Sequence, residues 1–218
     1  MIQKLLSHIL NCNTHHALWL NTLSYLENCG ARKIAACEHP TLVKEEMLKH
    51  AAEEFRHAHH LKRQISKIST KQLPDYTQKN LLGGSHSLHY LNRLDVRSSR
   101  YLIAQGISKT NIKIYSYILV TYAVELRAEA IYPVYDTALK QMRSKATVKN
   151  ILIEEKEHLD SMKQQITNLP RGTLLSQDII VIENAIYEKW MHRLHKIYCS
   201  DPLTQIQSYT KRGKEFHI

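Results

Sequence analysis

Residues 51–58 read AAEEFRHA and place a glutamate and a histidine three positions apart, as Glu54-x-x-His57. Side chains at positions i and i+3 lie on the same face of an α-helix. Spacings of three and four residues join this glutamate to a stripe that is otherwise apolar. The stripe consists of Met47, Ala51, Glu54, Ala58, Leu61, Ile65 and Ile68. This periodicity predicts a helix over about 41–68 that packs in a bundle with one carboxylate in its buried face.

The same pattern recurs a hundred residues later. Residues 154–159 read EEKEHL and contain Glu155-x-x-His158 within a second apolar stripe. This stripe consists of Val148, Ile151, Glu155, His158, Met162, Ile166 and Leu169. Two further predicted helices, over about 14–37 and 111–142, each place one glutamate in an apolar stripe, Glu27 and Glu125. Each of the four main helices is therefore expected to bury one carboxylate near its midpoint.

Four buried carboxylates require compensation by cations or by shared protons, because an isolated buried charge is strongly unfavourable. Metal ions meet this requirement most simply. Carboxylates favour hard divalent ions and imidazole suits iron, so the donor set indicates iron or manganese. The predicted ligands of a dinuclear site are Glu27, Glu54, His57, Glu125, Glu155 and His158.

The alternative is a helix phase that is wrong by one residue. Glu53 and Glu154 then replace the neighbouring glutamates, since each forms an i, i+4 pair with the same histidine. Their polar flanking residues argue against this phase. We therefore expect Ala substitution of Glu53 or Glu154 to leave metal binding largely intact, in contrast to substitution of Glu54 or Glu155.

Composition restricts the class of protein. The chain has 218 residues, six glycines, five prolines and 43% hydrophobic residues, which favours an all-α soluble domain over a β protein or a disordered chain. The four cysteines form no CxxC pair, which excludes rubredoxin-like and zinc-ribbon modules. No signal peptide or membrane-spanning segment is recognised, so the expected compartment is the cytoplasm.

The expected architecture is a single helical domain over 1–200, followed by a polar tail over 201–218. The linker over about 69–110 is long enough to hold a helix near 85–104 that returns along the bundle as a crossover. Pro133 is expected to kink the helix over 111–142. A further C-terminal helix is expected over about 174–199, after Pro170-Arg171-Gly172.

These segments resemble the ferritin-like di-iron carboxylate proteins, in which two helices each supply a Glu and two each supply a Glu-x-x-His. The resemblance covers roughly residues 14–169. Glu125-x-x-Ala128-x-x-x-Tyr132 is similar to the third helix of aldehyde-deformylating oxygenases, and the helix over 41–68 resembles that of tRNA-modifying hydroxylases.

The resemblance implies a ferritin-like four-helix bundle that binds two iron ions, or Mn and Fe, and activates dioxygen or peroxide. It implies an oxidase or oxygenase that acts on a tRNA base or on a lipid or aldehyde and needs an external electron donor. Glu54 and Glu155 would bridge the ions, and Glu27 and Glu125 would be terminal ligands. The alternatives are a metal-binding or iron-scavenging protein without an organic substrate, and a metal-free bundle that acts as an adaptor.

Other polar residues receive weaker predictions. Glu129 is either an extra ligand or proton shuttle, or a residue of the surface or of a substrate cavity. Tyr122 and Tyr132 lie one and two turns from Glu125, where they either hydrogen-bond a ligand or carry an electron, or pack in the core. Second-shell acids for His57 and His158 are not identifiable from the sequence. The paired histidines are expected to be exposed; they are His15, His16, His59 and His60.

The chain is basic, with a formal net charge of +10. If the linker is a crossover, eight basic residues gather at one pole of the bundle. They are Lys62, Arg63, Lys67, Lys71, Lys140, Arg143, Lys145 and Lys149. This basic pole either only increases solubility or docks an anionic partner such as tRNA or an acidic electron donor. A homodimer is one expected oligomeric state.

Overall fold

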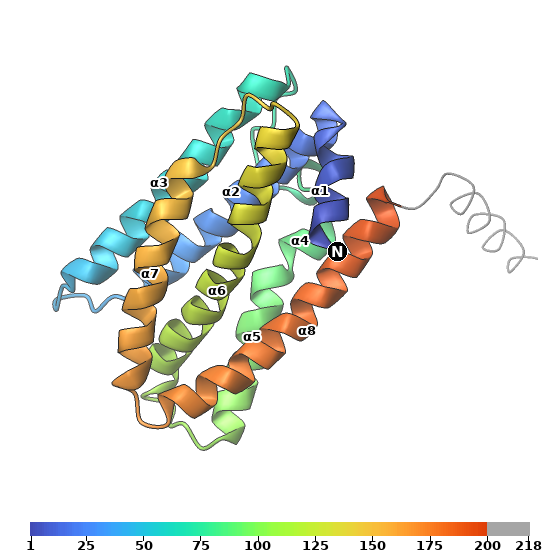
Figure 1. Ribbon diagram of the computed structural model, residues 1–218. Helices are drawn as coiled ribbons and strands as arrows, with labels where there is room; N and C mark the ends of the chain where they lie inside the picture. Colours follow the sequence, from blue (N-terminus) through green and yellow to red (C-terminus); the bar gives the residue numbers. More distant parts are fainter. Residues whose placement is uncertain (200–218) are drawn as a thin grey trace, which may run out of the picture.

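The protein is described by a computed structural model, which covers residues 1–199 and leaves the predicted polar tail outside the described residues (Figure 1). Over this range the chain is all-α, as predicted, with no strand. The helices in chain order are α1 (Ile2–Leu10), α2 (Asn13–Cys37), α3 (Glu45–Ile68), η1 (Gln78–Asn80), α4 (Ser85–Leu88), α5 (Tyr90–Ala104), α6 (Ile112–Gln141), α7 (Lys149–Thr167) and α8 (Gly172–Tyr198).

Four of these helices form the bundle that holds the predicted ligands. Helix α2 packs chiefly against α3, and α6 packs chiefly against α7, so the chain contributes two antiparallel helix pairs. Contacts of α2 with α6 and of α3 with α7 join the pairs. None of the helices within residues 1–199 has the length and apolar character needed to cross a bilayer.

The predicted crossover is confirmed. Helix α5 carries the chain back along the bundle, so α3 and α6 run in the same direction and end at the same pole (Figure 1). Hydrogen bonds at that pole connect the end of α3 to the loop between α6 and α7. The Nε2 atom of His60 lies 2.8 Å from the carbonyl oxygen of Thr147, and the Thr147 amide donates to Gln64 Oε1 at 3.2 Å.

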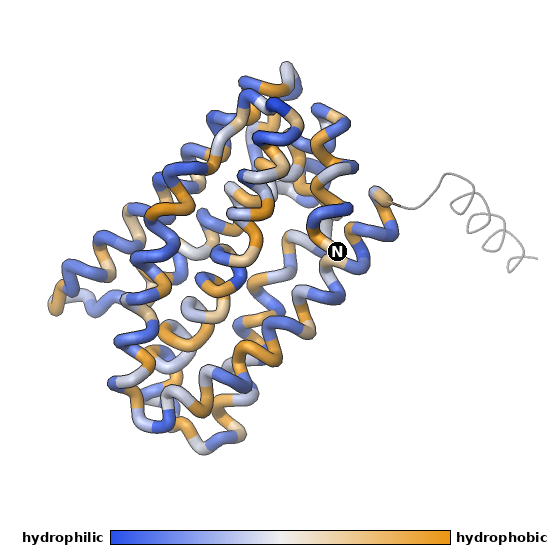
Figure 2. Tube along the Cα trace, in the orientation of Figure 1, coloured by the Kyte–Doolittle hydropathy of each residue, from blue (hydrophilic) through white to orange (hydrophobic). Residues whose placement is uncertain are grey.

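The buried apolar side chains form two clusters, and the glutamates of the bundle lie between them. On α3, Met47 and Ala51 belong to one cluster, while Leu61 and Ile65 belong to the other. Helix α7 contributes Ile151 to one cluster and Met162 to the other. In Figure 2, hydrophobic and hydrophilic residues alternate along every long helix, as the bundle periodicity requires. The core is thus divided by one polar layer.

The structure differs from the predicted helices at two places: one helix was not predicted, and one predicted boundary is wrong. Residues 2–10 form helix α1, which sequence analysis missed; its Leu5, Leu6 and Ile9 are completely buried against the bundle. Thr41 does not open the next helix, which begins at Glu45. Instead, the His39 ring nitrogen Nδ1 accepts hydrogen bonds from the Thr41 and Leu42 amides at 3.2 and 3.0 Å, which stabilises a turn before the helix.

The C-terminal helix is present as predicted and closes one side of the bundle. Helix α8 packs against α5 and α6, and its Trp190 stacks on Trp19 of α2 with ring centroids 6.0 Å apart. The indole of Trp190 donates a hydrogen bond to Ser87 Oγ at 2.9 Å. Helices α5 and α8 therefore form the outer layer beside the polar core. Helix α6 continues through Pro133 to Gln141.

Candidate metal centre

The structure brings all six predicted ligands into the polar layer between the two apolar clusters. Glu54, Glu125 and Glu155 are almost fully buried, with relative exposures of 5%, 3% and 3%. Glu27 is half-buried because it lines a cavity that reaches the layer. The alternative helix phase is disfavoured, since Glu53 and Glu154 keep 15% and 22% of their side-chain surface exposed.

The donor atoms divide into two groups, in each of which one atom per residue lies within 4.8 Å of the others. One group contains His50, Glu54, Glu125 and His158. The other contains Glu27, Glu54, His57 and Glu155. Glu54 belongs to both groups, so its carboxylate occupies the position expected of a bridging ligand.

The polar atoms at the centre face one another without ordinary partners. His158 Nδ1 lies 3.2 Å from Glu54 Oε1, and His57 Nδ1 lies 3.2 Å from Glu155 Oε1. None of these four buried atoms has a hydrogen-bond partner. Buried polar groups in native proteins are normally satisfied, so unsatisfied donor and acceptor atoms gathered in one place require an explanation. These buried His and Glu groups could hold a metal ion, which would satisfy all four atoms.

The outer nitrogens of the two predicted histidine ligands are held by carboxylates from the opposite helix. Nε2 of His57 lies 2.6 Å from Glu154, and Nε2 of His158 lies 2.9 Å from Glu53. In the neutral form of each ring these contacts favour the proton on Nε2, so Nδ1 is the nitrogen that would face a metal ion at the centre. Arg56 in turn binds both oxygens of Glu154 at 2.9 Å. Glu53 and Glu154, which the sequence pattern disfavours as ligands, are therefore the acids that orient the two histidines. The sequence alone did not identify them in this role.

This pairing corrects the expectation that Glu53 and Glu154 are dispensable. Ala substitution of either is expected to weaken metal affinity about 10–100-fold, the usual cost of losing an outer partner of a histidine ligand. Competitive titration against a metal-binding dye would measure the loss. Glu157→Ala is a control, because Glu157 is exposed and pairs with the exposed Lys49 at 3.3 Å. Unchanged affinity in both Glu53→Ala and Glu154→Ala would contradict this role.

Crowding of like charges sets the protonation of the metal-free centre. Burial and the neighbouring carboxylates raise the pKa of Glu27 and of Glu125 well above the usual value. Burial would raise the pKa of Glu54, but His158 and His50 lower it below its usual range. The same contact overcomes burial at His158 and raises its pKa to about 9. The centre therefore retains protons near neutral pH, and metal binding must displace them.

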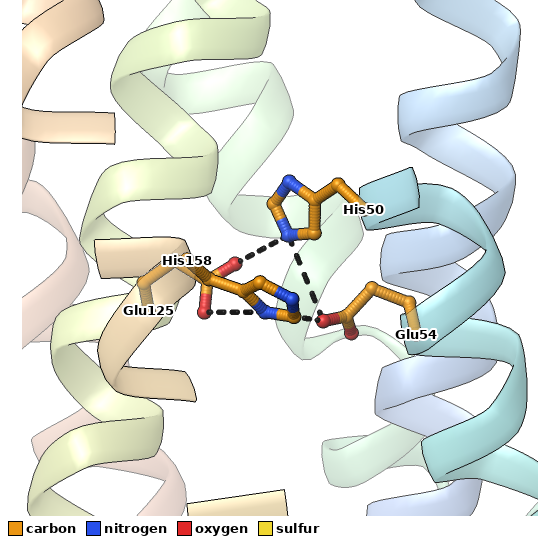
Figure 3. Close-up of side chains that lie close together, drawn as sticks. All are labelled: His50, Glu54, Glu125 and His158. Carbon is orange, nitrogen blue, oxygen red and sulfur yellow. Dashed lines mark hydrogen bonds and ion pairs between the residues drawn. The ribbon is translucent and has the colours of Figure 1, made fainter. Parts of the chain in front are cut away.

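A third buried histidine belongs to the centre, and sequence analysis missed it. His50 of α3 is 6% exposed, and its Nε2 lies 3.0 Å from Glu125 Oε1 and 3.6 Å from Glu54 Oε1. Figure 3 shows His50 and His158 directed at the same two carboxylates. His50 lies one turn before Glu54 and three residues after Met47. This i, i+4 spacing was the signal in the sequence that could have identified it.

The other predicted residues have different locations. Tyr132 is buried and its hydroxyl donates a hydrogen bond to Glu27, so it belongs to the centre. The side chain of Glu129 is exposed, so it is a surface residue and neither a ligand nor a proton shuttle. Tyr122 is partly buried and packs against one of the two apolar clusters.

The paired histidines are only partly exposed. His59 is exposed as predicted, whereas the predicted exposure of His16 is wrong. His16 is 2% exposed, and its Nε2 lies 2.7 Å from the hydroxyl of Tyr135. Its burial lowers the pKa of His16 to about 4, so it is a neutral core residue. His15 packs edge-on against Tyr198.

An apolar cavity of about 80 Å³ borders the centre. Its lining includes Glu27, Glu54, Glu125 and Glu155 together with mostly apolar side chains of α2, α5, α6 and α8, and Lys33 and Arg127 also contribute. The wall residues include Leu23, Leu26, Leu91, Val120, Val124, Ala128, Ile131 and Trp190. An apolar cavity with a few convergent polar groups is the usual form of a small-molecule site.

The basic residues at the shared ends of α3 and α6 form two sets. The side chain of Lys62 is held by two contacts. Its ammonium group donates a hydrogen bond to the Leu73 carbonyl at 2.6 Å and lies 4.5 Å from the centre of the Tyr76 ring. Lys140 pairs with Asp136 at 2.5 Å. Lys140 is nevertheless exposed, as are the other six residues: Arg63, Lys67, Lys71, Arg143, Lys145 and Lys149. The docking of tRNA or an acidic electron donor at this basic pole stays a prediction.

No protein-family model, curated protein or solved structure matches the chain. What the centre can bind thus follows from its donor atoms, its burial and the cavity beside it.

Proposed function

We propose that the protein is a non-haem di-metal oxidoreductase, with two iron ions or Mn and Fe, that oxidises or hydroxylates a small organic substrate. The observation that carries this proposal is the set of unsatisfied carboxylate and imidazole atoms beside an apolar cavity. Hard carboxylate oxygens combined with imidazole suit iron and manganese. Two divalent ions would also balance the four carboxylates of Glu27, Glu54, Glu125 and Glu155.

When bound, the metal pair would supply activation of dioxygen or peroxide. The remaining roles belong to the chain. Glu54 lies in both donor groups, whereas Glu27 and Glu155 lie in the group that contains His57. The hydroxyl of Tyr132 already donates a hydrogen bond to Glu27 at the cavity wall. Tyr132 is thus placed to hold a proton beside the substrate, while the apolar walls exclude water.

The size and lining of the cavity favour a slim aliphatic compound over a nucleobase. A cavity of 150 Å³ in another protein binds benzene, and the cavity here has about 80 Å³. Its walls are mostly Leu, Val, Ile and Ala side chains, which suit an alkyl chain. We therefore favour the lipid or aldehyde alternative over the tRNA base. Electrons would come from an external donor, for which the exposed basic residues offer a docking surface.

The test is oxygen uptake that depends on a substrate. Metal-free protein is loaded with ferrous iron without oxygen, and ¹⁸O₂ is then admitted with or without short linear alkanals, alkanols and alkylamines. The expected result is faster uptake with at least one compound and an oxidised product identified by mass spectrometry. Uptake that is the same with and without every compound would instead support the iron-scavenging alternative.

A cavity-filling variant separates the substrate site from the metal centre. Ala128 lines the cavity, so Ala128→Phe is expected to reduce substrate-dependent uptake at least about 10-fold while the bound metal is unchanged. Ala130→Phe is the control, because Ala130 is exposed on the same helix. Equal loss in both variants, or no loss in Ala128→Phe, would rule out this cavity as the substrate site.

A further inference from the structure

We infer that His50 is a seventh metal ligand and that the two ion positions of the centre are consequently unequal. This inference rests on the proposed metal pair and adds to the predicted ligand set a residue that the two Glu-x-x-His motifs do not contain. One position would have two imidazoles, from His50 and His158, and the other would have one, from His57.

The first argument is that His50 and His158 face the same point. The two imidazole rings are neighbours, with centroids 4.1 Å apart. Nε2 of His50 lies 3.6 Å from Glu54 Oε1, and Nδ1 of His158 lies 3.2 Å from the same oxygen. Both nitrogens also face Glu125, at 3.0 and 4.0 Å (Figure 3). Two imidazole nitrogens that converge on the same two carboxylates outline one coordination position.

The second argument is burial. His50 is almost as inaccessible as Glu54 and His158, with 6% relative exposure against 5% for each of them. A neutral imidazole placed beside two carboxylates can only donate one hydrogen bond to them, and it leaves the remaining oxygens unsatisfied. Glu54 Oε1, the atom that His50 and His158 share, has no hydrogen-bond partner. An ion at this point would satisfy that oxygen and His158 Nδ1, and it would replace the hydrogen bond between His50 Nε2 and Glu125 Oε1.

The third argument is the distribution of charge between the two groups. Beside the shared Glu54, the group with two imidazoles has one carboxylate, Glu125, while the other group has two, Glu27 and Glu155. Imidazole favours iron over manganese, whereas carboxylate suits manganese. The two positions would therefore bind different metals preferentially: iron beside His50, and manganese beside Glu27 and Glu155.

The test compares His50→Gln with the wild-type protein in Co²⁺ titrations followed by absorption and elemental analysis. Glutamine keeps an N–H donor for Glu125 but is a poor ligand for this ion. We expect the variant to bind one ion normally and the second more than about 100-fold more weakly. Loss of an outer hydrogen bond would weaken metal affinity by only about 10–100-fold. His59→Gln, on the exposed face of the same helix, is expected to bind two ions like the wild type.

The outcomes separate this inference from the proposed function. If the wild type binds two ions and His50→Gln binds them almost equally well, the role of His50 is overturned while the proposed function is not. Absence of metal from the wild type would overturn both. A second measurement needs no variant: crystals of wild-type protein grown with equal Mn²⁺ and Fe²⁺ should give iron anomalous scattering beside His50 and manganese scattering beside Glu27. Equal mixing at both positions, or the reverse order, would contradict unequal positions.

Discussion

Glu54→Ala is expected to lower the metal content of ferrous-reconstituted protein from about two ions per chain to none. Glu54 is the residue that both donor groups share, so its loss removes a ligand from each position at once. Its Oε1 also lies 3.2 Å from Nδ1 of His158. Elemental analysis after gel filtration measures the effect directly. Glu46→Ala is the matched control, because Glu46 is exposed on the same helix.

The variant should nevertheless fold. Removing this carboxylate relieves its repulsion of Glu27 and Glu125 but also removes the acceptor that raises the pKa of His158, so the two effects oppose each other and the unfolding temperature should stay close to that of the metal-free wild type. The wild type, by contrast, should be stabilised by metal, because an ion that binds only the folded state shifts the unfolding equilibrium. A Glu54→Ala variant that binds two ions with wild-type affinity would exclude Glu54 as a bridging ligand.

The sequence predicted the polar layer because helix periodicity alone decides which glutamates face the core. Glu53 and Glu54 are neighbours in the chain, but successive residues on a helix differ by about 100° in direction. The apolar stripe through Met47 and Leu61 thus favours Glu54 as the buried residue, and the structure buries it at 5% relative exposure. The crossover was predicted from a different feature, the length of the linker over about 69–110.

What could not be predicted depends on contacts between helices. Glu53 reaches His158 from a position 105 residues away, and Glu154 reaches His57 from 97 residues away. No local pattern specifies such pairs, because they depend on the rotation and axial position of one helix relative to another. His50 was missed for a related reason: a histidine between apolar positions resembles the edge of a stripe until the facing carboxylates are known.

The cavity wall depends on a buried ion pair that no motif indicated. Glu183 of α8 is 2% exposed and binds Arg127 of α6 through both oxygens, at 2.9 and 2.6 Å. The hydroxyl of Tyr90 on α5 also donates to Glu183, and the Arg127 guanidinium lies 3.7 Å from the Tyr187 ring centre. This cluster joins three helices, and Arg127 and Tyr90 both line the cavity.

Glu183→Ala is therefore expected to destabilise the protein by about 3–5 kcal/mol, since it leaves the partly buried Arg127 charge and the Tyr90 hydroxyl without their acceptor. For a chain of this size that loss corresponds to about 6–20 °C in unfolding temperature, measurable by circular dichroism or calorimetry. Glu188→Ala, exposed on the same helix, should change it by no more than about 0.5 kcal/mol.

A double variant distinguishes an ion pair from simple packing. Arg127→Met combined with Glu183→Met removes both charges and fills the space, so it should recover much of the stability that Glu183→Ala loses. If the double variant is as unstable as the sum of its single variants, the two residues act independently and the ion pair does not hold α8 against α6. If it recovers stability but loses substrate-dependent oxygen uptake, the pair maintains the shape of the cavity as well as the fold.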